Sequence, residues 1–170
     1  MDLRIYTDGS AAPTNPGPTG FGAMYVWEDG LHELGWASRA AGTNNTAELE
    51  GALEAIRGIS RTPSCIAIVC DSQYVTRGCT EWLPSWKAKL FTKKGKPMKN
   101  QALWISMDAM LSSVESKGIP LEFDWVRGHS GDHYNEIVDD VARWAARAQL
   151  TGLHRGDAST DWYSELGIEG

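Results

Sequence analysis

The stretch IYTDGSAAPTNPG, residues 5–17, joins a β-forming run to a long polar turn. Its apolar and β-branched residues predict a strand over residues 3–7, with the carboxylate of Asp8 directly at the strand end. Glycine, serine, proline and asparagine then dominate, and none of residues 9–17 is charged. A strand that delivers an acid to an uncharged loop suggests part of a site, and the remaining chain must supply the other members.

The rest of the 170-residue chain predicts a single α/β domain. Further β-type runs lie at residues 21–40, 65–70 and 121–126, and Asp29-Gly30 marks a hairpin turn within the first of them. Helical spacing of apolar residues marks 46–59, 101–117 and 134–149, with a short helix at 72–79. We therefore expect a mixed sheet covered by helices. Residues 151–170 are expected to form a C-terminal tail, either mobile or docked through Trp162 and Tyr163.

The charge is distributed unevenly along the chain. The net charge is −6, which alone argues against a polyanionic partner. Residues 76–100, however, hold seven basic residues and one acid, so this segment carries +6 and the remainder −12. Salt screens charges beyond about 10 Å, so a local basic segment matters more than the total. The segment is either a surface for nucleic acid or a solvated lysine-rich loop.

Cysteine usage and hydropathy bear on the compartment. The three cysteines, Cys65, Cys70 and Cys79, are an odd count in a chain whose first 20 residues do not resemble a signal peptide. We interpret them as reduced thiols and expect a cytoplasmic protein. No apolar run approaches 18 residues, so we expect no membrane span.

Several acids stand where they could converge. Asp8 and Asp71 each follow a predicted strand, and parallel neighbouring strands would bring both carboxylates to one sheet edge. Glu48 lies early in a helix beside small residues, although a glutamate there also complements the helix dipole. In the last helix, Asp139 and Asp140 both lie off the apolar stripe, and periodicity does not choose between them.

A histidine and a metal ion would complete such a site. His129 stands in a glycine-rich loop between a strand and a helix, where it is free to move and exchange protons. Gathered carboxylates repel one another unless a cation binds them, and oxygen ligands suit Mg²⁺ or Mn²⁺. Two such ions about 3.5–4 Å apart activate water and stabilise a leaving oxygen. Acids and a basic segment together indicate metal-assisted hydrolysis of nucleic acid.

Five motifs in order resemble ribonuclease H of type 1, over roughly residues 2–148. They are YTDGS (6–10), TNNTAELEGALEAI (43–56), CDSQYV (70–75), MKNQALW (98–104) and WVRGHSGDHYNEIVDDVA (125–142). The resemblance implies the ribonuclease H-like fold, an α/β architecture with a mixed five-stranded sheet flanked by helices. It places the catalytic domain at residues 1–150 and the C-terminal tail at 151–170.

The resemblance also implies an activity and its residues. It makes Asp8, Glu48, Asp71 and Asp139 the metal-binding carboxylates for two Mg²⁺ ions, with Asp8 bridging both, and selects Asp139 because the family's last aspartate lies ten residues beyond the loop histidine. His129 resembles the mobile histidine that assists proton transfer or product release. The implied reaction is endonucleolytic cleavage of the RNA strand of an RNA–DNA hybrid, leaving 5′-phosphate and 3′-hydroxyl ends.

The implied substrate contacts fall on both strands of the hybrid. The expected contacts to the RNA strand in the minor groove are Gly9, Ser10, Asn15, Asn44, Asn45 and Gln73. Asn44 and Asn45 could equally cap a helix. Those to the DNA strand are Thr43 and Asn100 in a phosphate pocket, and Trp82, Lys87 and Lys89 on a basic protrusion. Trp82 either packs on deoxyribose or holds the protrusion in shape. Ala41 replaces an arginine common in the family, which leaves open whether Arg39 takes its part.

Three rival functions differ from a monomeric hybrid-specific nuclease. A non-catalytic hybrid-binding module is disfavoured because all four acids are present. Another nuclease or an integrase-like protein of the same broad fold is disfavoured by the loop histidine and the basic protrusion. A fold-related ATPase is disfavoured because no phosphate-cradling glycine loop follows beyond Asp8-Gly9.

Overall fold

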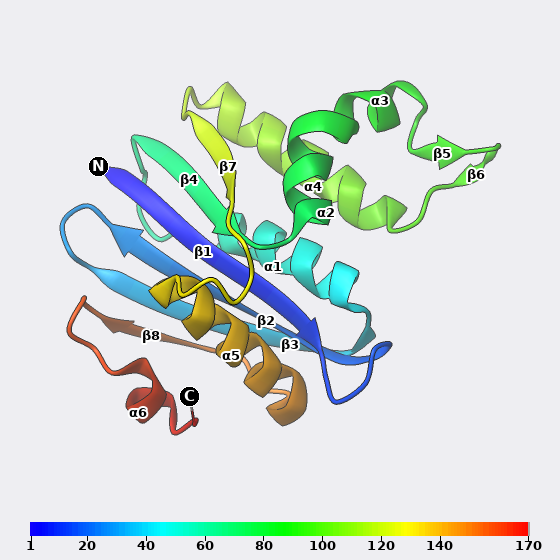
Figure 1. The fold of residues 1–170 in the computed structure, drawn as a ribbon. Helices are drawn as coiled ribbons and strands as arrows, with labels where there is room; N and C mark the ends of the chain where they lie inside the picture. Colours follow the sequence, from blue (N-terminus) through cyan, green and yellow to red (C-terminus); the bar gives the residue numbers. More distant parts are fainter. Residues whose placement is uncertain (170) are drawn as a thin grey trace.

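The structure is a computed structural model that describes residues 1–169. It consists of one large sheet with helices on both faces, and an arm that extends from one side (Figure 1). In chain order the elements are β1 (Asp2–Ala11), β2 (Gly17–Trp27), β3 (His32–Gly42), α1 (Asn44–Arg57), β4 (Cys65–Cys70), α2 (Gln73–Arg77), the π-helical turn η1 (Gly78–Trp82), α3 (Leu83–Ala88), β5 (Thr92–Lys93), β6 (Lys96–Pro97), α4 (Gln101–Ser116), β7 (Leu121–Trp125), α5 (His133–Ala148), β8 (Gly152–Gly156) and α6 (Trp162–Leu166).

The main sheet has six strands in the order β7-β4-β1-β2-β3-β8. β1, β2 and β3 form an antiparallel meander, whereas β4 pairs parallel to β1 and β7 parallel to β4. The predicted mixed α/β sheet is therefore confirmed, but the expected count of five strands is wrong by one. The additional strand, β8, pairs antiparallel with β3, from His32 opposite Gly156 to Trp36 opposite Gly152. Its five residues are too short to show a clear periodic pattern.

Two apolar clusters cover the two faces of the sheet. On one face, the buried stripe Leu49, Leu53 and Ile56 of α1 packs with residues of α4 against β1, β2 and β4. On the other face, α5 packs against the sheet through Ile137, Val138 and Val141. Figure 1 shows α5 in front of the sheet and α1 behind it. α1 begins near the end of the sheet to which β1 points, where Ala47 lies against Gly9. α5 runs in the same direction as β1, from Tyr134 beside Tyr6 and His32 to Ala146 beside Gly20.

β1 extends further than the sequence predicts. Residues 3–7 were expected as the strand, with Asp8 at its end, but β1 runs on to Ala11 because it pairs with β2 as far as Thr19. Gly9 and Ser10, expected in a loop, are therefore in the strand. The parallel pairing of β1 with β4 ends earlier, at Tyr6 opposite Val69. Asp8 thus lies beyond the last β4 pair while its backbone stays fixed by β2.

The C-terminal segment is built onto the sheet edge and the α5 face. Beyond β8, α6 begins at an Asp161 cap whose side chain accepts a hydrogen bond from the Ser164 amide. Trp162 is only 2% exposed and belongs to the apolar cluster beneath α5. The ring of Trp162 meets that of His154 edge-on at 5.8 Å between centroids, and His154 also pairs with Glu165.

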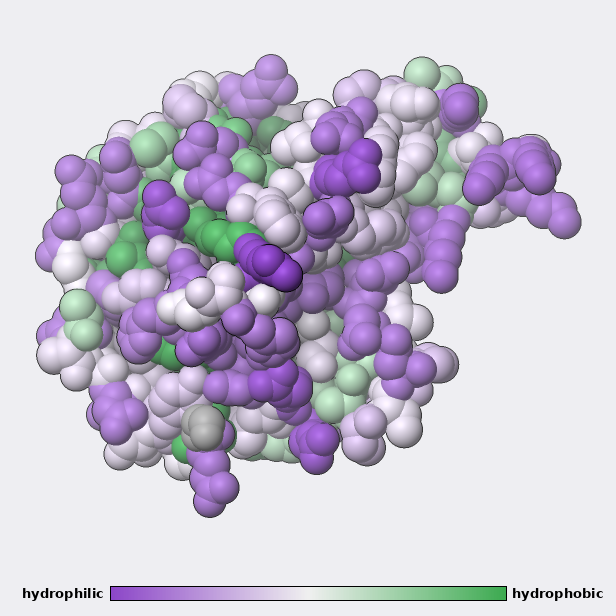
Figure 2. Space-filling view, in the orientation of Figure 1, coloured by the Kyte–Doolittle hydropathy of each residue, from purple (hydrophilic) through white to green (hydrophobic). Residues whose placement is uncertain are grey.

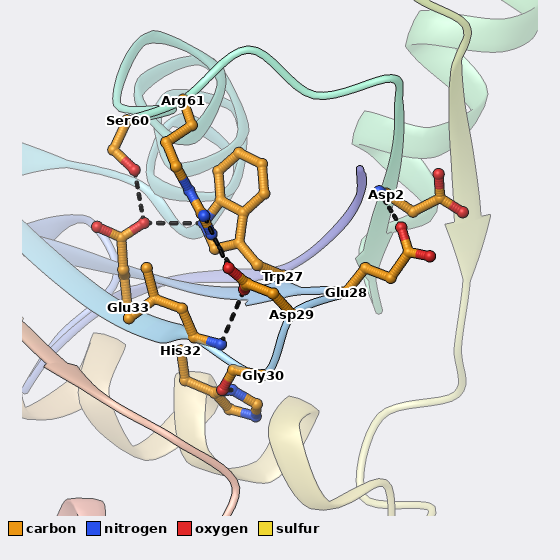
Figure 3. A network of polar contacts seen from close by, with 10 residues as sticks. Asp2, Trp27, Glu28, Asp29, Gly30, His32, Glu33, Ser60 and Arg61 are labelled. Atoms are coloured by element: carbon orange, nitrogen blue, oxygen red, sulfur yellow. Dashed lines mark hydrogen bonds and ion pairs between the residues drawn. The ribbon is translucent and has the colours of Figure 1, made fainter.

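A polar network closes the end of the sheet opposite the carboxyl ends of β1 and β4 (Figure 3). Glu33 in β3 is buried, and its carboxylate accepts hydrogen bonds from Trp27 Nε1, Ser60 Oγ and Arg155 Nε. Burial would raise the pKa of Glu33, but these three donors lower it below its usual range. The network joins β2, β3, the segment after α1 and β8.

A second part of this network rests on one arginine. Arg61 donates two hydrogen bonds to Asp29 in the β2–β3 turn, and its guanidinium lies 4.3 Å from the centroid of the Trp27 ring (Figure 3). The turn at Asp29-Gly30 is the predicted hairpin turn, and the Asp29 carboxylate also accepts from the Leu31 amide. The hairpin is therefore tied to the segment that follows α1.

The arm consists of α3 and the β5–β6 ribbon, and its outer end is strongly hydrophilic (Figures 1 and 2). Its inner part rests on a row of aromatic rings in which Trp86 lies 4.8 Å from the fully buried Trp104 and 5.7 Å from Trp82. Within residues 1–169, no helix has the length and apolar character needed to cross a membrane.

Candidate active site

Three carboxylates gather at the carboxyl end of the parallel strands. One oxygen of each of Asp8, Glu48 and Asp71 lies within 4.8 Å of the other two. Asp8 comes from β1, Glu48 from the second turn of α1, and Asp71 from the residue after β4. Asp8 is only 3% exposed, and its Oδ1 accepts a hydrogen bond from the Gly9 amide at 2.8 Å. The set offers only carboxylate oxygens, which fits a hard divalent cation.

A close approach of α1 to β1 brings two of these acids together. A Cβ on Gly9 would stand 2.2 Å from the carbonyl carbon of Ala47, so only glycine allows this contact. Glu48 is the next residue of the helix, and the contact places it beside Asp8. Gly51, one turn on, similarly faces the backbone oxygen of Asp8 and the Phe21 side chain. These small residues therefore set the spacing of the site.

The fold holds these carboxylates together although burial and mutual repulsion disfavour their ionised forms. Burial, reinforced by the neighbouring Glu48, raises the pKa of Asp8 well above its usual range. Loss of hydration likewise raises the pKa of Glu48. The pKa of Asp71 is also raised by burial, although the Asn135 amide beside it opposes the shift. A cation bound between the three groups would relieve this repulsion, which is the electrostatic signature of a metal site.

Asp139 lies beside the three gathered acids but is not one of the group within 4.8 Å. Its Oδ2 accepts a hydrogen bond from Arg143 at 2.7 Å, and the same guanidinium also binds Asp140. Neither Arg143 nor the buried Asn135 was selected from the sequence. The spacing of four residues between Asp139 and Arg143 on a helix is the signal that could have found the arginine.

His129 lies on the loop between β7 and α5, beside Asp139. Its side chain is 81% exposed, and its Nδ1 stands 4.0 Å from Asp139 Oδ2. A Cβ on Gly128 would meet Asp71 Oδ2 at 3.1 Å, so the glycine lets this loop come close to Asp71. The histidine thus combines proximity to the site with freedom to move.

A polar depression of about 340 Å³ lies between the β1–β2 loop and the start of α1. Its walls are formed by Asn15, Pro16, Thr43, Asn44, Asn45 and Lys99. Asn15 Oδ1 accepts from the Asn44 amide, and Asn44 Oδ1 accepts from the Ala11 amide. The cap of α1 is Thr43, whose hydroxyl accepts from the Thr46 amide, so the two asparagines are not the capping residue.

The remaining residues predicted to contact the substrate have different surroundings. Lys99, which sequence reasoning did not select, lines the depression, whereas the neighbouring Asn100 donates from its amide to the Tyr74 hydroxyl. Gln73 is exposed at the first position of α2. Arg39 forms an ion pair with Glu50 at 3.0 Å, so its charge is already engaged.

Of the predicted contact residues on or beside the arm, some side chains are engaged within the protein and others are exposed. The Trp82 ring lies 5.7 Å from that of Trp86 and 4.9 Å from the guanidinium of Arg77, which favours the structural alternative for this residue. Lys87 reaches Asp108 of α4 at 3.4 Å, whereas Lys89 and the lysines of the β5–β6 ribbon are exposed. The exposed lysines therefore lie mainly toward the outer end of the arm, whose surface is hydrophilic in Figure 2.

Solved structures share this architecture. LC9-RNase H1, described as a type 1 RNase H with the type 2 active-site motif, aligns over 99% of this chain and 81% of its own with a TM-score of 0.75 and 29% identity. LC11-RNase H1, solved in complex with an RNA/DNA hybrid, aligns over 86% of this chain and 97% of its own with a TM-score of 0.62 and 22% identity. By fold and by the arrangement of its acids, the molecule is an α/β protein of the ribonuclease H-like class.

Sequence comparisons define the family. The model of the RNase H family matches residues 1–147. A ribonuclease H of Pseudomonas paraeruginosa is 42% identical over 140 residues, which cover 81% of this chain and 88% of the relative. A ribonuclease H of Cyanothece sp. is 42% identical over 157 residues, covering 89% and 94%. The chain therefore belongs to the ribonuclease H family of enzymes, and the resemblance found in its motifs is confirmed.

Proposed function

We propose that this enzyme cleaves the RNA strand of RNA–DNA hybrids endonucleolytically, with two divalent ions at the acid site, and leaves 5′-phosphate and 3′-hydroxyl ends. The observation that carries the proposal is the convergence of Asp8, Glu48 and Asp71 within 4.8 Å in a chain of this family. Asp8, Glu48, Asp71 and Asp139 are the proposed ligands, and Mg²⁺ is the proposed ion, with Mn²⁺ able to replace it.

The residues of the site have distinct proposed tasks. Bound divalent ions would supply an activated water and charge neutralisation at the scissile phosphate. The four carboxylates would hold and space those ions, and Asp8 is buried and hydrogen-bonded to the Gly9 amide. His129, exposed and close to Asp139, exchanges a proton with solvent near the reacting phosphate.

Recognition of the hybrid is proposed to use both strands. The side-chain oxygens of Asn15 and Asn44 each accept from a backbone amide, so these two residues offer their NH₂ donors, whereas Asn45 offers a donor and an acceptor. Such groups suit 2′-hydroxyls in a shallow minor groove. Thr43 and Lys99 line the same depression, where the lysine adds a charge for a backbone phosphate. The exposed lysines of the arm would bind phosphates further along the duplex.

Two further proposals concern the cellular compartment and the number of chains in the active unit. All three cysteines are free in the structure, which is consistent with a reducing, cytoplasmic setting. We propose that a single chain is the active unit, because the proposed ligands and contacts all come from this chain.

The test compares end-labelled RNA–DNA hybrid, duplex RNA and duplex DNA of one sequence, each with Mg²⁺ or with EDTA. Internal cuts confined to the RNA strand of the hybrid, and only with Mg²⁺, are the expected result. Binding without cleavage would indicate the non-catalytic hybrid-binding module instead. Cleavage of duplex DNA would favour a nuclease or integrase-like activity.

A further inference from the structure

The C-terminal helix α6 contacts α5 through one polar side chain close to the active site. Tyr163 donates its hydroxyl hydrogen to Asp140 Oδ2 at 2.7 Å. The preceding residue, Trp162, is 2% exposed in the cluster beneath α5, so the position of α6 is fixed by packing. The tyrosine hydroxyl is therefore presented from a firmly docked element.

Asp140 connects Tyr163 to Asp139 through the guanidinium of Arg143. The second oxygen of Asp140, Oδ1, accepts from Arg143 at 2.5 Å, and the other terminal nitrogen of the guanidinium donates to Asp139 Oδ2 at 2.7 Å. Tyr163, Asp140, Arg143 and Asp139 thus form a continuous chain of hydrogen bonds from α6 to the fourth carboxylate. All four side chains are partly buried, so the bonds are protected from full competition by water.

The position of Asp139 depends on this chain because little else holds it. The other three carboxylates are packed together within 4.8 Å, whereas Asp139 Oδ2 has the guanidinium of Arg143 at 2.7 Å and His129 Nδ1 at 4.0 Å. His129 is 81% exposed and on a loop, so it offers no rigid support. An aspartate side chain has three staggered χ1 positions, and the fixed guanidinium selects one of them.

We infer that Tyr163 is a positioning residue of the metal site, which fixes Asp139 through Asp140 and Arg143 and thereby raises the affinity of the site for a divalent cation. The inference rests on the proposed role of Asp139 as a ligand. If the Tyr163 hydroxyl is removed, Asp140 keeps only its bond to Arg143 and is free to turn, and the guanidinium can follow it away from Asp139. Asp139 then explores several positions, and the cation must restrict them when it binds.

The size of the effect can be bounded. Loss of a group that orients a metal ligand typically reduces metal affinity by about 10–100-fold. Tyr163 acts through two intervening side chains, so we expect the lower end of that range, about tenfold. The hybrid contacts lie on other elements, so the KM for hybrid at saturating metal should stay unchanged.

The experiment is a calorimetric titration of Mn²⁺ into the full-length wild type and Tyr163→Phe, without substrate. Tyr163→Phe should bind Mn²⁺ about tenfold more weakly. Its activity should fall at low metal and return at high metal. Glu165→Gln is the matched control, because it loosens α6 at its ion pair with His154 without touching the chain of hydrogen bonds. This control should bind Mn²⁺ as the wild type does.

A second variant keeps the test decisive. Asp140→Ala removes both acceptor oxygens and cuts the same chain at the next contact, so it should also weaken Mn²⁺ binding. The double variant Tyr163→Phe/Asp140→Ala should bind no more weakly than Asp140→Ala alone. Should Tyr163→Phe fail to fold by circular dichroism, Asp140→Ala alone decides. The inference is overturned if these variants bind Mn²⁺ like the wild type, if Glu165→Gln weakens binding equally, or if the wild type binds no Mn²⁺. A failure of hybrid cleavage with intact Mn²⁺ results would contradict the proposed function alone.

Discussion

Asp8 is the residue at which stability and function oppose one another most directly. It is almost fully buried beside two other carboxylates, and its pKa is raised well above the usual range by burial and by Glu48. In the unfolded chain it ionises at about pH 4. Between that pH and its raised pKa, folding therefore disfavours the ionised form. The metal-free protein loses stability at this site as the pH rises, and retains it in acid.

We expect Asp8→Asn to abolish hydrolysis while retaining hybrid binding. The amide keeps the shape but removes a ligand charge, and without metal it also removes the buried repulsion. The metal-free variant should therefore melt higher than the wild type at pH 8, by about 2–4 °C for each kcal/mol relieved. The difference should shrink toward pH 4. Calorimetric melting in EDTA and a cleavage assay measure both effects, and cleavage above a few per cent of the wild-type rate would show that the acid site is misassigned.

His129 should behave differently because it is not packed into the site. We expect His129→Ala to slow turnover by about 10²–10⁴-fold and to leave measurable activity, since a proton shuttle contributes that much. Stability should change little, because the side chain is 81% exposed. Single-turnover rates and melting temperatures of the two proteins decide the matter. A loss as complete as that of Asp8→Asn, or a marked loss of stability, would mean that the histidine is a ligand or a structural residue.

The sequence alone located the carboxylates of the site better than the residues that surround and position them. Asp8 and Asp71 each follow a β-forming run, and that local pattern was enough to bring them to one sheet edge. Tyr163 reaches Asp140 across 23 positions of sequence, and nothing local to either residue signals the contact. Lys99 was missed as a site residue for a different reason, because it was counted only among the seven basic residues of segment 76–100.

At the scale of elements, the helices α1, α4 and α5 and the short strands β4 and β7 were predicted within two residues, whereas β1 was predicted too short and β8 was not predicted. β1 was predicted too short because pairing with β2, rather than composition, extends it through Gly9 and Ser10 to Ala11. β8 was missed for a similar reason. Its strand state is fixed by the exposed edge of β3 and by Arg155, which reaches the buried Glu33. Contacts with residues distant in the sequence therefore determine whether such segments form strands.

The arm supports a prediction about binding rather than chemistry. Replacing Lys89, Lys93, Lys94 and Lys96 with alanine should raise KM and leave kcat nearly unchanged, because these exposed side chains would contact phosphate equally in the ground and transition states. Lys87 is left in place because it already pairs with Asp108. The salt dependence of log affinity should flatten by up to about 0.9 for each phosphate that the variant no longer binds.

Hybrid affinity measured at several salt concentrations tests this directly. Arg57→Ala is a control, because it removes one positive charge from the end of α1, where Arg57 pairs with Glu54. It should leave the salt slope unchanged. An unchanged slope in the lysine variant would identify the arm as a solvated loop. The residues outside 76–100 carry a net charge of −12, so the molecule would then require another basic surface to hold a polyanion.

For the whole molecule, the C-terminal segment decides how much of the chain acts as one unit. The RNase H family model ends at residue 147, yet the sheet continues to β8 and the cluster beneath α5 includes Trp162. Removing this segment would expose the edge of β3 and leave the buried Glu33 without its Arg155 partner. We therefore propose that residues 151–170 belong to the folding unit of the catalytic domain.

A chain ending at residue 150 should be less stable than the full chain. Loss of the buried Trp162 side chain alone should cost about 3–5 kcal/mol, which corresponds to about 2–4 °C in Tm for each kcal/mol. It should also bind Mn²⁺ more weakly, because Tyr163 is removed with α6. The control ends at residue 168 and keeps α6 whole, so it should melt and bind as the full chain does. If the chain ending at residue 150 melts at the full-length temperature, the catalytic domain folds without the segment, and the contacts of β8 and α6 add nothing to its stability.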